Sequence, residues 1–182
     1  VSAYIPTNII SITDGQIFLE SSLFFAGQRP AVNVGLSVSR VGGDAQTKAM
    51  KRAAGTLRLD LAQYREIEVF MQFASDLDET TRAQLAYGQG LMRLLRQPQY
   101  HPMSRSQQVI TLVAAMHHIM QNIPRDEIGA FRDEMLAWFE HSAAELCASI
   151  EGTGLLSDGD KGKLESLAEQ FLGVWSSRRE GA

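Results

Sequence analysis

Gly42-Gly43, which closely follows Arg40, is the first place where the sequence offers a chemical site. Glycines at a strand-to-helix junction let the backbone approach a phosphate group, and this pair resembles half of such a site. The chain lacks the G-x-x-x-x-G-K-[ST] pattern that would complete it with a lysine. We therefore predict no independent phosphate site here, and Arg40 taken by itself is interpreted as a surface arginine.

The histidines and the paired acids form no metal-binding or catalytic pattern. His117 and His118 are adjacent, so on a helix they point about 100° apart and cannot chelate as an i, i+4 pair would. Each acid pair lies at a turn before a helix, where carboxylates cap exposed N–H groups; the pairs are Asp76 with Asp78 and Asp158 with Asp160. We predict neither a metal site nor a Ser/His/Asp arrangement.

Composition narrows the class of protein. The chain has 182 residues and a net charge of −4, so a general attraction to nucleic acid or to an anionic membrane is not expected. Its single cysteine, Cys147, excludes an internal disulfide and is interpreted as a small buried hydrophobic residue. No apolar run approaches the roughly 18 residues that a membrane span needs, so we expect no direct membrane insertion.

The stretch before Gly42 predicts short strands. Their predicted ranges are 9–13, then 16–19 after a tight turn at Asp14-Gly15, and 32–38, where Val32, Val34, Leu36 and Val38 alternate with small or polar residues. Three short strands make a poor independent sheet, so we expect them to belong to a larger one.

After Gly43 the pattern is helical. Helices are predicted from Asp44 to about Ala74 with a weak point at Gly55, from Asp78 through Leu95, from Ser104 through Met120, from beyond Pro124 through Ile150, and finally through Trp175. Residues 97–102 are expected to form a loop because they contain two prolines, and Gly152 and Gly154 are expected to stop the fourth helix. This part is predicted to be a helical bundle.

Seven stretches follow, in order and spacing, the pattern of one known family. They are AYIPTN (3–8), ITDGQI (12–17), RPA (29–31), VGLSVSRVG (34–42), AQYRE (62–66), SDLD (75–78) and LLRQPQY (94–100). The series resembles the alpha subunits of F-type ATP synthases. Beyond Ser104 the resemblance rests on helix pattern and length.

The resemblance implies a mixed α/β fold followed by an all-α part. The terminal strands of a P-loop-type (RecA-like) nucleotide-binding domain would come first, followed by an α-helical bundle. The implied division places the end of the nucleotide-binding domain in residues 1–89 and the helical domain in residues 90–182. The β-barrel domain and phosphate-binding loop that precede these in the family are not in the sequence. We therefore expect a fragment that does not hydrolyse ATP by itself.

The resemblance gives Arg40 a catalytic role. Arg40 matches the family's arginine finger, which reaches the catalytic nucleotide held mostly by a neighbouring beta subunit. Negative charge spreads over the γ-phosphoryl oxygens during transfer, and a guanidinium donates two N–H bonds to such oxygens. Ser39 and Ser37 are weaker candidates for orienting it.

A second site is also implied, because alpha subunits bind an adenine nucleotide that they do not hydrolyse. Phe24, Arg29, Pro30, Gln97 and Gln99 match positions at its adenine and ribose end. A ring and a proline flank a base, while amides hydrogen-bond its edge. The implied cofactor of the complete subunit is ATP or ADP with Mg²⁺, whose ligands are not in this chain, and we expect poor ATP binding by the fragment alone.

The implied partners are the beta, gamma and delta subunits of a proton-translocating ATP synthase. The chain would then act as a regulatory subunit, peripheral to the cytoplasmic face of a bacterial plasma membrane. One alternative stays open: a non-enzymatic helical assembly module from a truncated or orphan alpha-like gene.

Overall fold

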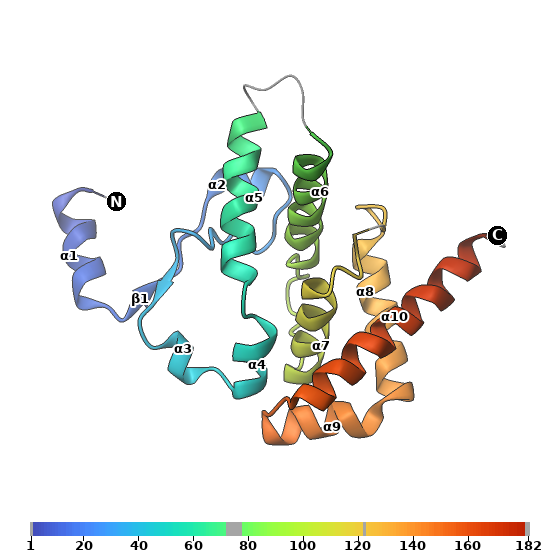
Figure 1. The fold of residues 1–182 in the computed structure, drawn as a ribbon. Helices are drawn as coiled ribbons and strands as arrows, with labels where there is room; N and C mark the ends of the chain where they lie inside the picture. Colours follow the sequence, from blue (N-terminus) through green and yellow to red (C-terminus); the bar gives the residue numbers. More distant parts are fainter. Residues whose placement is uncertain (1, 72–77, 122, 181–182) are drawn as a thin grey trace.

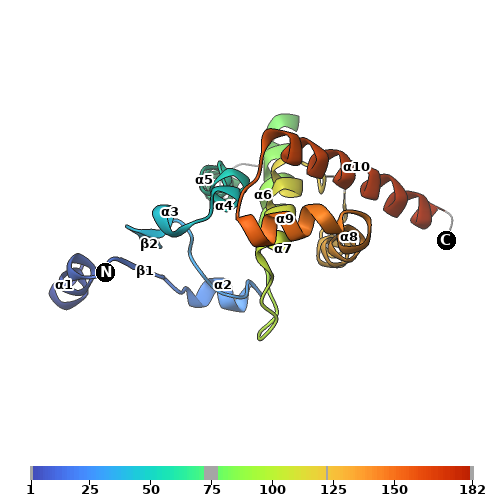
Figure 2. The ribbon, with the colours of Figure 1, turned by 90° about the horizontal axis from the view of Figure 1, so that it is seen from below.

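The computed structural model describes residues 2–71, 78–121 and 123–180, which form a small irregular N-terminal segment and a larger helical part. The segment with α1 and the β1–β2 pair lies to one side, and α8 to α10 lie on the other (Figures 1 and 2). The predicted fold class, a mixed start followed by an all-α part, is confirmed, although the mixed part contains much less strand than expected.

The N-terminal segment is built from short elements: α1 (Tyr4–Ile12), β1 (Gly15–Gln16), α2 (Ser21–Phe25), β2 (Val38–Ser39) and α3 (Gly42–Ala45). The two strands pair antiparallel, with Gly15 opposite Ser39 and Gln16 opposite Val38. A Cβ on Gly15 would lie 2.2 Å from the Val38 carbonyl oxygen, so this close pairing requires glycine. One isolated antiparallel bridge, Leu19 with Val32, extends the contact.

The strand predicted for 9–13 is wrong, because residues 4–12 form helix α1. A strand here would need a partner for its backbone groups, and helical bonds satisfy those groups locally instead. The Thr7 N–H donates to the Ala3 carbonyl at 3.0 Å, and the Thr13 N–H donates to the Ile9 carbonyl at 3.2 Å. No residue of α1 is buried, so the helix contributes no buried side chain to the core.

The other two predicted strands are much shorter than expected. The second reduces to Gln16 of β1 and to Leu19 of the isolated bridge, and the third reduces to Val32 of that bridge and to β2. Asn33 explains the third, since its side-chain oxygen accepts the Leu36 N–H at 3.0 Å and its carbonyl accepts the Ser37 N–H at 3.0 Å. These bonds close a turn where the alternation of valines had predicted a strand.

The long helix predicted from residue 44 is divided into α3, α4 (Lys48–Ala53) and α5 (Leu57–Met71). Thr47 starts α4 afresh, because its hydroxyl accepts the Met50 N–H at 3.2 Å. The second break falls at residues 54–56, around the predicted weak point Gly55. The predicted end of this helix near Ala74 and the break at 75–77 lie outside the described residues.

The remaining helices are α6 (Glu79–Leu94), α7 (Arg105–Met116), α8 (Ile128–Ser142), α9 (Ala144–Thr153) and α10 (Asp158–Glu180). The predicted N-caps of α6 and α7 are confirmed: Asp78 accepts the Thr81 N–H at 3.2 Å, and Ser104 with Gln107 forms a capping box.

Two helix ends differ from prediction, and a third agrees with it in part. Helix α7 stops at Met116, although the following Ile119 and Met120 are still buried. The fourth predicted helix breaks at Ala143 into α8 and α9. Gly154, in the left-handed region at φ 64°, ends α9 as predicted, whereas Gly152 lies inside the helix.

Helix α7 lies at the centre of the core and contacts α4, α8, α9 and α10. The largest fully buried side chains come mainly from α7, α8 and α10 and are Phe131, Phe139, Phe171, Ile128, Met135, Ile150, Leu164, Val109 and Val113. Burying each such side chain stabilises the fold by about 1.5–3 kcal/mol. The N-terminal segment is linked to the helical part by polar contacts of Asn33 with Arg65 of α5 and of Arg96 with Gln28 and Ala26.

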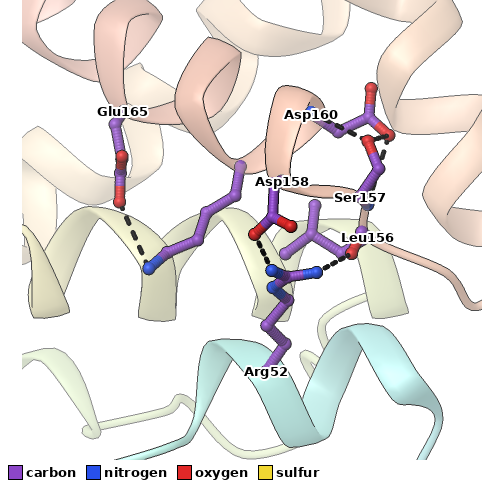
Figure 3. Close-up of polar contacts among 7 residues, drawn as sticks. Arg52, Leu156, Ser157, Asp158, Asp160 and Glu165 are labelled. Atoms are coloured by element: carbon purple, nitrogen blue, oxygen red, sulfur yellow. Dashed lines mark hydrogen bonds and ion pairs between the residues drawn. The ribbon is translucent and has the colours of Figure 1, made fainter.

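Polar contacts fix the start of α10 on α4 (Figure 3). Arg52 of α4 donates to the Leu156 carbonyl at 3.0 Å and forms an ion pair with Asp158. Ser157 and Asp160 cap the helix reciprocally, since Asp160 accepts the Ser157 hydroxyl at 2.6 Å and Ser157 accepts the Asp160 N–H at 3.0 Å. Asp158 and Asp160 were both predicted to cap a helix. Asp160 caps α10, whereas Asp158 connects α10 to α4 through its ion pair with Arg52.

Candidate functional site

Arg40 lies directly after β2, at the end of the short strand pair. Its backbone N–H donates to the Asp14 carbonyl at 2.8 Å, which fixes the main chain at the point where the side chain leaves it. The side chain is exposed, and among the described residues its guanidinium has no hydrogen-bond or ion-pair partner. A cation on a fixed backbone with all its donors unused is suited to an anion brought by another molecule.

The two serines near Arg40 hold the chain rather than the guanidinium. The Ser37 hydroxyl donates to the Asn33 carbonyl at 2.6 Å and accepts the Phe18 N–H at 2.9 Å. It therefore connects the backbone at Phe18 to the turn that begins at Asn33. The Ser39 side chain packs against Gly42, where an added Cβ would come 2.6 Å from the hydroxyl oxygen. The first glycine of the pair is therefore needed for this close packing.

The five residues predicted for a nucleotide site meet at one place. Phe24, Arg29 and Pro30 come from α2 and the loop after it, and Gln97 and Gln99 come from the loop between α6 and α7. All five line one open hollow of about 1200 Å³, including space continuous with solvent. We call it the loop hollow. Arg40 does not line it, so the structure contains two separate candidate sites.

One hydrogen bond joins the two loops of the loop hollow, and two further contacts lie within the separate loops. The Gln97 N–H donates to the Arg29 carbonyl at 2.9 Å, and the Gln97 amide donates to the His101 carbonyl at 3.0 Å. The Arg29 guanidinium lies over the Phe24 ring, 4.6 Å from its centroid. The hollow thus offers a ring, a proline and amide groups, which suit a flat heterocycle with hydrogen-bonding edges.

Two arginines that the sequence analysis did not single out support these loops. Arg96 donates to the Gln28 side chain at 3.2 Å and to the Ala26 carbonyl at 3.3 Å, which holds the α2 loop to the end of α6. Arg132 of α8 donates to the Leu94 and Arg96 carbonyls at 3.3 and 2.9 Å, so it holds the end of α6. Both act over long sequence separations, and no local pattern could have revealed them.

Other lining residues of the loop hollow were also missed. Tyr100, at φ 64°, together with His101 and Pro102 adds a ring, an imidazole and a second proline. Their membership of the same proline-bounded loop as Gln97 and Gln99 is the signal that could have identified them.

The described residues contain no group of three or more His, Cys, Asp or Glu side chains that could hold a metal ion. His117 instead contacts Glu169 at 2.8 Å, and the His118 ring packs on Tyr87 with centroids 4.3 Å apart. The described residues therefore do not fit a Mg²⁺ site. Within the described residues, no helix combines the length and apolar character needed to cross a membrane.

Comparison with known proteins covers nearly the whole chain. Residues 46–171 match the family model for the ATP synthase alpha/beta chain, C terminal domain, and residues 1–39 match the ATP synthase alpha/beta family, nucleotide-binding domain. Proteins described as ATP synthase subunit alpha are 54% identical over 96% of this chain in Petrotoga mobilis and 52% identical over 99% of it in Lacticaseibacillus casei. A third, from Syntrophomonas wolfei, is 52% identical over 97%. The chain spans 35% of the length of each of these relatives.

Proposed function

The chain belongs to the ATP synthase alpha/beta family, and from that premise we propose that it forms the C-terminal part of an alpha-type subunit in a proton-translocating ATP synthase. In that complex the chain has a regulatory role, through a bound nucleotide, and a catalytic role, because Arg40 enters the active site of the neighbouring beta-type subunit. The observation that carries the proposal is the meeting of Phe24, Arg29 and Pro30 with Gln97 and Gln99 at one hollow.

The loop hollow is proposed to hold the base and ribose of an adenine nucleotide that is not hydrolysed. The Phe24 ring and Pro30 offer flat apolar contacts, while Gln97 and Gln99 offer amide donors and acceptors. The hydrogen bond between Gln97 and Arg29 already holds the two loops together. A ligand that contacts both loops therefore binds with a smaller loss of conformational entropy. The phosphates would be held by the family's phosphate-binding loop, which the sequence above does not contain, so this chain alone is expected to bind ATP poorly.

Arg40 is proposed to act on a different nucleotide, one held at the interface with a beta-type subunit. The short strand pair fixes its backbone, and its exposed guanidinium is unpaired among the described residues. Two parallel N–H bonds from such a group stabilise the charge that develops on the transferred phosphoryl group. Because the donors are already free, no ion pair within the described residues has to be broken first.

The proposal includes partners that the family implies: beta, gamma and delta subunits, with ATP or ADP and Mg²⁺ in the assembled head. The printed sequence contains no phosphate-binding lysine loop, so we propose that this chain does not hydrolyse ATP alone. Its place would be at the membrane surface, attached through the complex rather than by a span of its own.

Nucleotide retention by the assembled complex tests the hollow. We expect Phe24→Ala to weaken adenine nucleotide binding at the non-catalytic site about tenfold or more, since stacking of a base on a ring contributes roughly 1–3 kcal/mol. Phe70→Ala is the matched control, because Phe70 of α5 is 63% exposed and does not line the hollow, whereas Phe25 packs on the Phe24 ring. Equal retention by wild type, Phe24→Ala and Phe70→Ala would place the nucleotide elsewhere.

A further inference from the structure

Five arginines surround a second hollow that adjoins the loop hollow. They are Arg29, Arg93, Arg96, Arg125 and Arg132, and Asp126 is the acid that lines the hollow with them. We call this the basic hollow. Its open volume is about 640 Å³, including space continuous with solvent. The chain as a whole carries a net charge of −4, so this concentration of positive charge is local and opposite in sign to the net charge.

Two of the arginines are already committed to the fold. Arg132, 8% exposed, donates to the Leu94 and Arg96 carbonyls and pairs with Asp133 at 2.7 Å. Arg96 donates to the Gln28 side chain and to the Ala26 carbonyl, so it has no carboxylate partner among the described residues. Their side chains are held in place, which makes them fixed walls of the hollow.

The other three arginines are not neutralised. Among the described residues, Arg93 and Arg125 have no hydrogen-bond or ion-pair partner through their side chains, and the Arg29 guanidinium lies on the Phe24 ring. Burial lowers the pKa of Arg96, and the positive charge of Arg93 lowers it further. The Arg93 and Arg96 guanidinium groups therefore repel each other, and an anion bound beside them would relieve that repulsion.

The start of α8 adds to the positive character of the basic hollow. Gly129, in the first turn of this 15-residue helix, lines it, and the α8 N-cap has no side-chain bond. The Glu127 carboxylate at that cap pairs with Arg179 of α10 instead. The first-turn N–H groups, which no side chain caps, and the helix dipole thus favour negative charge at the same place as the arginines.

We propose that the basic hollow binds a polyvalent oxyanion of the phosphate class, such as phosphate or pyrophosphate. Planar guanidinium groups donate paired N–H bonds to adjacent oxygens, and several of them suit a ligand with more than one oxygen face. The basic hollow is next to the proposed adenine site but distinct from it, and Arg29, Gln97 and Pro98 line both hollows. The phosphate group could come from a free anion or from a nucleotide, and the test below separates these sources.

The test is titration calorimetry of the chain with sodium pyrophosphate at low ionic strength, followed by the same titration with ATP. The double variant Arg93→Gln/Arg125→Gln should weaken pyrophosphate binding about tenfold or more, since charge-assisted bonds to each guanidinium are lost. The control Arg58→Gln/Arg178→Gln removes the same charge from exposed arginines that do not line the hollow, and it should bind within about twofold of wild type.

The outcomes are separate from those for the adenine site. Gln99→Ala should leave pyrophosphate binding unchanged if the anion is bound in the basic hollow, because Gln99 lines the loop hollow and not the basic hollow. Equal losses in the two double variants would show a general charge effect and overturn the proposal. Absence of pyrophosphate binding by the wild type, with ATP binding weakened in Arg93→Gln/Arg125→Gln but not in the control, would support the site and identify a nucleotide as the source of the phosphate group. Binding of both ligands by Arg93→Gln/Arg125→Gln at the wild-type affinity would overturn the proposal.

Discussion

Asn33 holds the N-terminal segment to the helical part, and its replacement by alanine should loosen both candidate sites. The side chain is 3% exposed and makes three hydrogen bonds. It accepts from the Leu36 N–H at 3.0 Å and from Arg65 of α5 at 2.6 Å, and it donates to Glu20 at 2.8 Å. Glu20 precedes α2, while Leu36 lies in the turn before β2, so one side chain connects three pieces of the fold.

The magnitude follows from those bonds. Net hydrogen bonds contribute about 0.5–1.5 kcal/mol each, and bonds to charged groups contribute about 1.5–3 kcal/mol. Arg65 and Glu20 are only partly buried, so water would compensate part of each loss. We therefore take about 1 kcal/mol for each bond and expect Asn33→Ala to destabilise the segment locally by about 3 kcal/mol.

Amide hydrogen exchange measures this local change directly. The Phe18 N–H donates to the Ser37 hydroxyl and the Ser37 N–H donates to the Asn33 carbonyl, so both amides report on the segment. Their exchange should become about 100-fold faster in Asn33→Ala. Asn8→Ala is the control, because the Asn8 side chain is exposed and has no partner among the described residues. Unchanged exchange at both amides in Asn33→Ala would refute this account of how the segment is held.

Two further predictions concern stability. Gly88→Ala should destabilise the chain by about 1–3 kcal/mol in urea denaturation, because the new Cβ would lie 2.3 Å from the Tyr64 ring, whereas Gly162→Ala, with nothing within 4 Å, should be neutral or stabilising. Burial raises the pKa of Tyr87, with help from the charge and hydrogen bond of Asp60. Stability from this group is therefore full below the ordinary tyrosine value of about 10 and falls as pH rises above it, because the unfolded phenol ionises first. Thermal midpoints from pH 8 to 11 should show a shallower alkaline fall in Tyr87→Phe than in wild type, and identical slopes would contradict the argument.

Local rules predicted much of the helical part correctly. The caps at Asp78 and Ser104, the loop at 97–102 and the stop at Gly154 all depend on backbone groups within a few residues. Short-range hydrogen bonding determines these features, so the sequence alone was sufficient to place them.

The strands were predicted poorly because strand formation depends on a partner. The isoleucines at 9, 10 and 12 favour a strand, yet no partner strand lies beside them among the described residues, and helix α1 forms instead. The breaks at Thr47 and Ala143 were also missed, because a local cap or turn ends a helix whose apolar pattern continues through it.

The residues of the loop hollow could be predicted from the family resemblance but not from local sequence patterns. Gln97 and Gln99 carry no chemical signal by themselves, and only the resemblance placed them with Phe24, Arg29 and Pro30. The structure brings the five together, whereas their roles, that of Arg40, and the division between residues 89 and 90 remain predictions. Arg96 and Arg132, which hold the loops, could not be predicted because their partners lie far away in sequence.

The most direct test of the central claim is ATP turnover by the assembled beta- and gamma-containing complex carrying Arg40→Ala in the alpha-type subunit. Removal of an arginine finger should lower multisite turnover by about 10³-fold or more. Arg58→Ala is the control: Arg58 is also an exposed arginine but lies in α5, and this variant should retain the wild-type rate. Turnover by Arg40→Ala equal to that of Arg58→Ala would contradict the assignment of Arg40 to the neighbour's catalytic site.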